Sequence, residues 1–148
     1  MEIKNKELET IKDCSSQELC VESCNFCCKV SGTNLENSSF SGTDLSGVVF
    51  KKGDMRCASF EQVGLTNSSF KSVNMVRSNF LQVGMSGSVM KQVDLDRADI
   101  DGSGIVNGII TNSDLRGLTI RGCKIIGMTI DGYEVMELIK FYKENHKD

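Results

Sequence analysis

Large apolar residues recur at every fifth position of the chain, from Leu35 to Ile130. The residue two positions before each of them is usually small, as at Thr33, Ala58 and Ser78, and the other positions are mostly Asn, Asp, Gly, Ser, Lys or Arg. An α-helix repeats its apolar face about every 3.6 residues and a strand about every second residue, so neither element fits this period. The pattern predicts a repeat architecture whose unit is five residues long.

Several of these units resemble a known consensus. GTDLS at 42–46 and RADID at 97–101 are similar to A-(D/N)-L-x-x, the unit of the pentapeptide-repeat proteins. The resemblance covers residues 19–132 and implies an all-β fold, a right-handed quadrilateral β-helix with four units, hence about 20 residues, in each coil. A single unit cannot bury its own apolar side chain, whereas coils stacked at strand spacing bury a continuous axis.

The large apolar residues of successive coils are expected to form four columns that point inward. Phe40, Phe60 and Phe80 share one column and Phe50 and Phe70 another, so aromatic rings should stack along the axis. The predicted structural core comprises Leu35, Phe40, Leu45, Phe50, Phe60, Phe70, Phe80, Leu95, Ile100, Leu115 and Ile120.

A stack of coils exposes apolar surface and unpaired strand edges at its ends, so both ends need a cover. The five-residue period stops after Gly132, and residues 133–148 are predicted to contain a C-terminal capping helix over about 133–145. The stripe expected to cover the last coil, or to join two rods, is Val135, Leu138, Ile139 and Tyr142. Residues 1–18 are expected to be an N-terminal cap or tail, with a weak helix through Ile3, Leu8 and Ile11 as one possibility and a charged, irregular tail as the other.

Cysteines cluster at the start of the repeat. Cys20, Cys24 and Cys27 have the C-x3-C-x2-C spacing with which radical-SAM enzymes hold an iron–sulfur cluster, but 148 residues leave no room for the large barrel of those enzymes. Cys24 and Phe26 fit instead as the small and large inward residues of one unit, after which the grid slips by one residue before Leu35.

A helix remains an alternative for the same stretch. A capping box formed by Ser15 and Glu18 would place Cys20, Cys24, Cys27 and Cys28 on one helical stripe. In either arrangement the thiols are expected to be small apolar fillers. Zinc is the weaker reading because the single histidine, His146, lies at the far end, so we expect neither metal nor cofactor.

Charge along the rod is balanced. Residues 31–132 carry ten acidic and ten basic side chains, and the whole chain has a net charge of −3. Lys51, Lys71 and Lys91 share one outward column and are a candidate surface for an acidic partner. The alternative is that Lys51 and Lys91 pair with Asp54 and Asp94, which belong to another outward column.

The sequence offers little for catalysis, since its one histidine is near the terminus and its carboxylates are expected on a convex surface. No hydrophobic run is long enough for a signal peptide or a membrane span, and an odd number of seven cysteines favours reduced thiols, so we expect a cytosolic location without membrane contact. No basic, aromatic-rich platform suggests direct nucleic acid binding.

The expected function is therefore a non-catalytic protein-interaction scaffold with an unidentified partner. The alternative comes from the best-known members of the resembling family, the Qnr-type quinolone-resistance proteins, which imitate duplex DNA and bind type II topoisomerases. The C-terminal IDGYEVMELIKF resembles the end of that group and implies a homodimer joined through the C-terminal helix. A neutral rod without loops favours the scaffold, because a DNA mimic should be acidic along its length.

Overall fold

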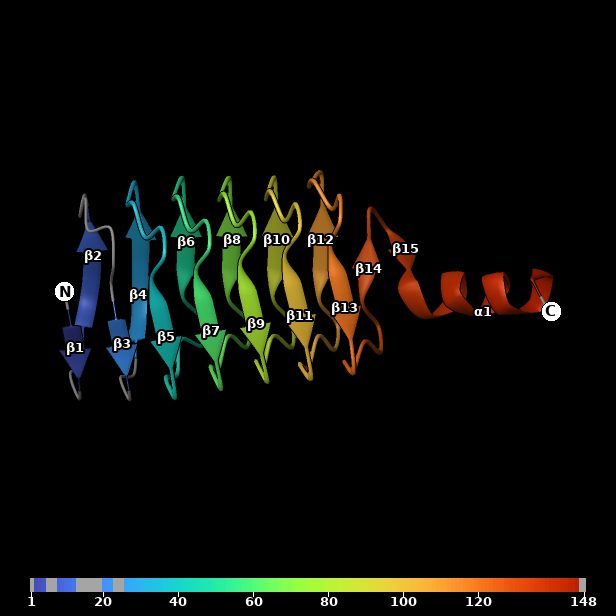
Figure 1. Ribbon diagram of the computed structural model, residues 1–148, viewed down its shortest axis with the longest axis horizontal. Coiled ribbons are helices and arrows are strands. Elements are labelled where there is room, and N and C mark those ends of the chain that lie inside the picture. Colours follow the sequence, from blue (N-terminus) through green and yellow to red (C-terminus); the bar gives the residue numbers. More distant parts are fainter. Residues whose placement is uncertain (1, 5–7, 13–19, 23–25, 147–148) are drawn as a thin grey trace.

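The protein is a rod of stacked coils from which one helix projects (Figure 1). The computed structural model describes the backbone of residues 2–4, 8–12, 20–22 and 26–146, and the side chains of residues 30–146. Five complete coils run from about residue 31 to residue 130, as the strand register shows. The quadrilateral β-helix that the family resemblance implies is confirmed, as is the C-terminal helix expected from the pattern after Gly132.

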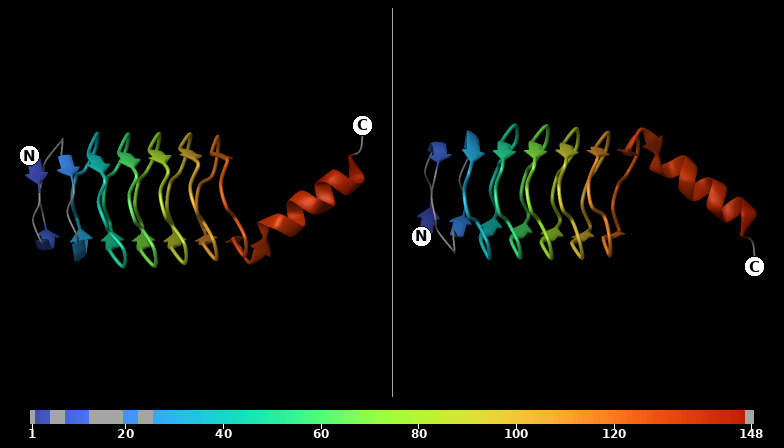
Figure 2. Two further views of the ribbon diagram at one scale, coloured as in Figure 1. Left: turned by 90° about the horizontal axis from the view of Figure 1, so that it is seen from below. Right: turned by 90° about the horizontal axis from the view of Figure 1, so that it is seen from above.

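Two sheets occupy opposite sides of the rod (Figure 2). In the described chain the first sheet contains, in spatial order, β1 (Glu2–Lys4), β3 (Cys20–Glu22), β5 (Ser39–Ser41), β7 (Ser59–Glu61), β9 (Asn79–Leu81), β11 (Asp99–Asp101) and β13 (Thr119–Arg121). The second contains β2 (Leu8–Lys12), β4 (Phe26–Ser31), β6 (Val49–Lys51), β8 (Ser69–Lys71), β10 (Val89–Lys91), β12 (Ile109–Thr111), β14 (Thr129–Ile130) and β15 (Tyr133–Glu134). Neighbouring strands are parallel except β14 and β15, because each coil carries the chain once round the rod in the same direction.

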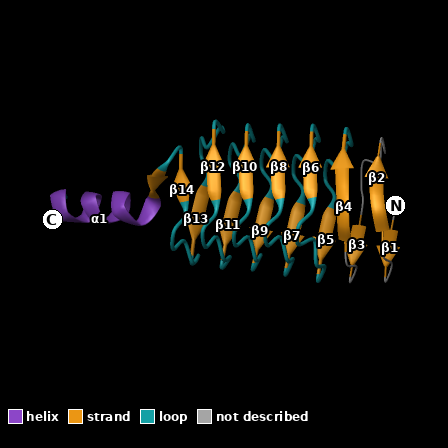
Figure 3. Ribbon diagram, turned by 180° about the vertical axis from the view of Figure 1, so that it is seen from behind, coloured by secondary structure: helices purple, strands orange, loops and turns teal. Residues whose placement is uncertain are grey.

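The other two sides of the rod are formed by single-residue β-bridges between coils. One column of bridges joins Asn34, Asp54, Asn74, Asp94 and Asp114, and the other joins Asp44, Gly64, Gly84, Gly104 and Lys124. Loops and turns link these sides to the strands (Figure 3). The rod therefore has four faces, each built from equivalent residues of successive coils.

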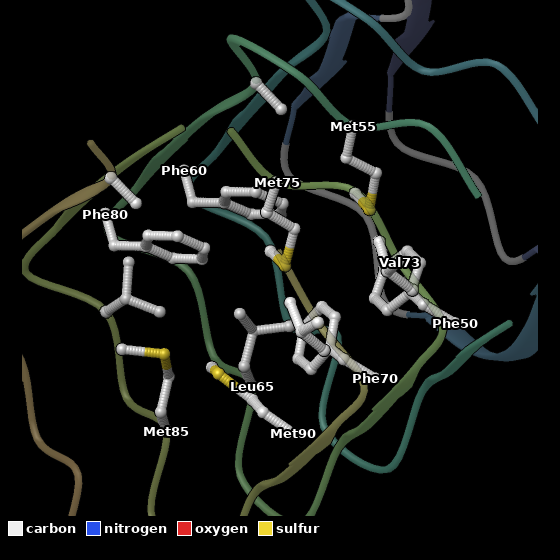
Figure 4. Packing of buried hydrophobic residues seen from close by; sticks show 14 of the residues in the cluster. Phe50, Met55, Phe60, Leu65, Phe70, Val73, Met75, Phe80, Met85 and Met90 are labelled. Carbon is white, nitrogen blue, oxygen red and sulfur yellow. The ribbon is translucent and has the colours of Figure 1, made fainter. Parts of the chain in front are cut away.

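The interior is filled by the predicted columns of large side chains. Phe60 lies between Phe40 and Phe80, with ring centroids 4.8 Å apart on each side and the rings within 5° of parallel. Phe50 stacks on Phe70 at 4.9 Å in the second column, and Met75 and Leu65 fill space beside these rings (Figure 4). Each ring thus depends on the next coil for its burial.

Burial falls at the C-terminal end of the columns. Nine of the eleven predicted core residues are buried, whereas Leu115 and Ile120 are only partly buried and pack against that core. Both belong to the last complete coil, which has no further coil stacked on it. The four predicted inner columns therefore exist, but their final members remain accessible to solvent.

At the N-terminus the structure replaces the expected helix with strands. Strand β1 aligns Ile3 with Val21, which aligns in turn with Phe40, and β2 aligns Ile11 with Val30. The helix considered for Ile3, Leu8 and Ile11 is wrong, because the sheet edges offer unpaired backbone groups that strands can satisfy. The two sheets consequently extend into residues 1–18.

The cysteine-rich stretch also lies in strands where it is described. Cys20 is in β3, and Cys27 and Cys28 are in β4, so the helical stripe is wrong at these positions. Cys24 lies outside the described residues, as do the side chains of the other three. Val21 aligns with Phe40 and Val30 aligns with Phe50. The step from Val21 to Val30 is nine residues, whereas the equivalent step from Phe40 to Phe50 is ten. The one-residue slip in the grid therefore lies before Val30.

The C-terminal helix does not cover the last coil. Asp131 and Gly132 have φ values of 47° and 85°, the left-handed pair of a two-residue hairpin turn, and they reverse the chain into β15. Helix α1 (Val135–Asn145) then runs obliquely away from the rod (Figure 2). Val135 packs against the core, but Leu138, Ile139 and Tyr142 are exposed, so the expectation that this stripe lies on the last coil of its own chain is wrong.

Replacing Phe60 by Ala should lower the free energy of unfolding by about 3–5 kcal/mol, because it removes two ring stacks and leaves a cavity. Replacing Glu61, the exposed next residue of β7, by Ala is the control and should change stability by less than about 0.5 kcal/mol. Urea unfolding followed by circular dichroism measures both. Equal losses in the two variants would show that the inward register is not as described.

Candidate interaction surfaces

The three lysines predicted as a partner surface lie side by side on one sheet. In-register pairing of β6, β8 and β10 aligns Lys51 with Lys71 and Lys71 with Lys91, and all three are exposed. Among the described residues, no ion pair joins any of them to a carboxylate; the recorded pairs all involve arginine. The alternative in which Lys51 and Lys91 are neutralised by Asp54 and Asp94 is therefore not found.

Asp54 is held instead by an arginine two residues further along the chain. The Arg56 guanidinium donates from Nε to both carboxylate oxygens at 2.9 Å, and its Nη2 lies 2.8 Å from Asp54 Oδ2 and 3.1 Å from Glu36 Oε2. Arg116 makes the same contact with Asp114, its Nη2 lying 2.7 Å from Oδ2. The recurring Asp-x-Arg sequence is the feature that sequence reasoning missed.

The column that contains Asp54 also has a structural task. The Oδ1 atoms of Asn34, Asp54, Asn74, Asp94 and Asp114 each accept a hydrogen bond from the backbone N–H two residues ahead, at 3.0–3.2 Å. This local bond satisfies an N–H that the coil leaves unpaired. The Oδ1 atom of either Asn or Asp can accept this bond, which explains why both residues occur in one column.

These contacts shift the ionisation of the carboxylates. Partial burial of Asp54 acts to raise its pKa, but the hydrogen bonds from Arg56 outweigh it and leave the pKa below its usual value. The side-chain and backbone hydrogen bonds from Arg116 likewise lower the pKa of Asp114. The pKa values of Arg56 and Arg116 are raised chiefly by the same pairs.

The opposite bridge face is flat and nearly uncharged. Gly64, Gly84 and Gly104 fill most of its bridge column, with Asp44 and Lys124 at the two ends. Outward residues beside them are Ser46, Thr66, Ser86, Val106 and Ile126. Asn67 lies so close over Gly87 that a β-carbon on Gly87 would clash with its Oδ1 atom.

Apolar side chains gather at the C-terminal end. Leu138 is 50% exposed, Ile139 38% and Tyr142 62%, and the helix has no buried residue. Phe141 and Tyr133 are also exposed, and sequence reasoning overlooked them because it assumed that one face of the helix would pack on its own coil. The end of the rod and α1 together therefore expose several large apolar side chains.

The described residues were compared with the requirements of a metal site and of a membrane-spanning helix. Within residues 30–146 no cluster of three or more His, Cys, Asp and Glu side chains is placed to hold a metal ion. Cys57 is exposed, and Cys123 is partly buried with its thiol directed at the Arg121 carbonyl oxygen 3.1 Å away. No helix in the described part of the chain is long and apolar enough to cross a membrane.

Comparison with known proteins finds one matching family model and several similar solved structures. A family model described as "Pentapeptide repeats (8 copies)" matches residues 28–67 and 43–82. A trypsin-treated form of QnrB1, a plasmid-mediated fluoroquinolone resistance protein, is similar at 16% identity over 93% of this chain and 96% of its own, with a TM-score of 0.38. The comparison with curated proteins returned no match.

Two further solved structures are similar to the chain. One is a pentapeptide repeat protein from the Arabidopsis thaliana thylakoid lumen, with 16% identity, coverage of 76% of this chain and 73% of that one, and a TM-score of 0.38. The other is HetL, a pentapeptide repeat protein involved in heterocyst differentiation regulation in the cyanobacterium Nostoc, with 8% identity, 86% and 92% coverage and a TM-score of 0.33.

Replacing Asp54 by Asn should preserve the bond to the Arg56 N–H, as Asn34 and Asn74 do, whereas replacing it by Ala should cost about 1 kcal/mol more through the lost bond. Because the folded-state pKa of Asp54 is depressed, its carboxylate contributes stability above the unfolded value of about 3.9 and loses it as the pH falls through the folded value. The difference between wild type and Asp54→Asn should therefore shrink in acid. Urea unfolding at neutral pH and below pH ~3 tests this; a constant difference would contradict the carboxylate–arginine account.

Proposed function

We propose that the chain, whose residues 28–82 match the pentapeptide-repeat family model, is a non-catalytic scaffold that binds another protein on the outer faces of the rod. Pentapeptide-repeat proteins are in general non-catalytic repeat proteins. The observation that carries the proposal is that large side chains fill the interior, which leaves the charged groups of residues 30–146 on the outer faces. Such faces suit contact with a macromolecule better than enclosure of a small substrate.

A DNA-mimicking inhibitor of a type II topoisomerase is the second candidate. The carboxylates of Asp54, Asp94 and Asp114 favour it, because they lie in one column along a single face. Arg56 and Arg116 neutralise two of the three, however, and another face carries lysines that have no ion pair among the described residues. The charge pattern therefore supports a scaffold more than an imitation of the DNA backbone.

A DNA gyrase supercoiling assay separates the two functions. A scaffold should leave supercoiling unchanged, with or without a quinolone, at protein concentrations up to several micromolar. Bovine serum albumin at equal concentration controls for non-specific effects. Inhibition of supercoiling, or protection of the enzyme from the drug, would overturn the scaffold proposal in favour of the mimic.

We further propose that two chains join end to end through their C-terminal ends. Leu115 and Ile120 remain partly open at the end of the rod, and Leu138, Ile139 and Phe141 are exposed on α1. A second copy related by a two-fold axis would cover both sets of residues at once. The structure supports this arrangement because one chain leaves its own end uncovered.

Light scattering tests the dimer. The wild-type chain should give twice the chain mass of 16.3 kDa, and Leu138→Glu should yield folded monomer, because it places a charge in the apolar contact. Lys140→Glu, on the same helix, is the matched control and should remain dimeric. A wild-type mass of 16.3 kDa across a wide concentration range would refute the proposal.

A further inference from the structure

The charged side chains on one face of the rod are all positive, and they lie on three consecutive strands of that face. We call it the lysine face and define it by the outward residues of β6, β8, β10 and β12 and the corner residue that follows each strand. Its charged members are Lys51, Lys52, Lys71 and Lys91, and all four are exposed. Between residues 49 and 112 neither these strands nor these corners carry a carboxylate, and the next acidic residue on the face is Asp131, whose Oδ1 accepts the Asn112 N–H.

The lysines lie closer together than like charges favour. Their strands are parallel and in register, so Lys51, Lys71 and Lys91 are direct neighbours across adjacent strands. Like charges directly opposite each other in a sheet are unfavourable. The described residues supply no carboxylate to offset this repulsion.

Several charges on the other faces have partners. Arg56 pairs with Asp54 and Glu36, and Arg116 pairs with Asp114. On the opposite sheet, Arg121 lies 2.6 Å from Asp99 and 3.1 Å from Asp101. The lysine face therefore holds the largest group of uncompensated charge on the described rod, although the rod as a whole is neutral.

A second column on the same face is apolar. Val49 alternates with Lys51 along β6 and Val89 with Lys91 along β10. Ile109 of β12 continues this column and is 42% exposed, while Ser69 of β8 interrupts it. The basic and apolar columns run next to each other along the rod axis. A ligand that fits both must present acidic groups along one edge and apolar groups along the adjacent edge.

The spacing of the columns selects the form of that ligand. Successive coils are 4.8 Å apart, as the stacked rings show, so Lys51 and Lys91 are separated by two such steps. In an α-helix residues i and i+7 are about 10.5 Å apart, close to this separation of about 9.6 Å, with a residue at i+3 or i+4 between them. Side chains on one edge of an extended strand repeat only every roughly 6.8 Å, so they no longer match the lysine spacing after two steps.

We propose that the lysine face binds an amphipathic α-helix of a partner protein that carries acidic residues at i, i+3 and i+7, lying along the rod axis with its apolar residues on Val49, Val89 and Ile109. This inference rests on the scaffold function and assigns it a surface and a partner chemistry. Nucleic acid fits less well, because the face has no exposed aromatic ring for base stacking and no arginine among its described residues.

The test uses fluorescence anisotropy with the full chain and a labelled helical peptide that has Glu at i, i+3 and i+7 and Leu on the adjacent edge. Control ligands are a scrambled peptide of the same composition and a single-stranded oligonucleotide of the same charge. The patterned peptide should bind wild type at low salt and weaken at about 0.3 M salt. The scrambled peptide and the oligonucleotide should bind at least about tenfold more weakly.

Two triple variants locate the site. Lys51→Gln with Lys71→Gln and Lys91→Gln should weaken peptide binding at least about tenfold, with thermal stability equal to or above that of wild type. Arg77→Gln with Lys124→Gln and Lys140→Gln removes three exposed positive charges from elsewhere and should change binding less than about twofold. Gel filtration and circular dichroism confirm that both variants are folded.

Several results would overturn the proposal. Equal losses of peptide affinity in the two variants would show that binding depends only on net charge. Equal binding of the scrambled peptide would show that the helical spacing of the acidic residues does not matter. Tighter binding of the oligonucleotide would identify a nucleic acid surface, and no binding by wild type at low salt would exclude the face. None of these results alters the gyrase assay, which judges the scaffold function separately.

Discussion

The rod depends on the in-register stacking of large inward side chains from one coil onto the next. A five-residue unit contributes one such side chain and has no second layer of its own, so only a neighbouring coil can bury it. Phe60 shows the consequence, since it is fully buried between Phe40 and Phe80. Leu115 and Ile120 occupy equivalent positions in the last coil and stay partly exposed because nothing stacks on them.

Once the inward positions are committed to packing, recognition has to use the outward ones. These positions differ from face to face. Asp54 and Asp114 are tied to arginines of their own units, while Lys51, Lys71 and Lys91 have no carboxylate partner among the described residues. A net charge of zero for residues 31–132 thus hides an asymmetry that only the assignment of residues to faces reveals.

The C-terminal end shows how a short turn changes the exposed surface. The left-handed pair Asp131–Gly132 turns the chain back on β14, and α1 leaves the rod instead of lying across it. Had the helix folded over the last coil, its apolar stripe and the coil would have covered each other. Both are left uncovered in the single chain, and the proposed dimer rests on this exposed apolar surface.

The sequence by itself determined the coil, the inward columns and the presence of the C-terminal helix, because a period of five residues fits no other regular structure and each large residue must be buried. It also placed Lys51, Lys71 and Lys91 in one column, since that follows from counting. Only the tertiary structure decided that Ile3 and Ile11 continue the sheets, because unpaired strand edges outweigh a weak local helical pattern. It alone decided that Asp54 binds Arg56 rather than Lys51, because the reach of a side chain around a corner depends on three-dimensional geometry. It also decided that α1 projects from the rod, because residue spacing does not contain the direction in which a chain leaves a turn.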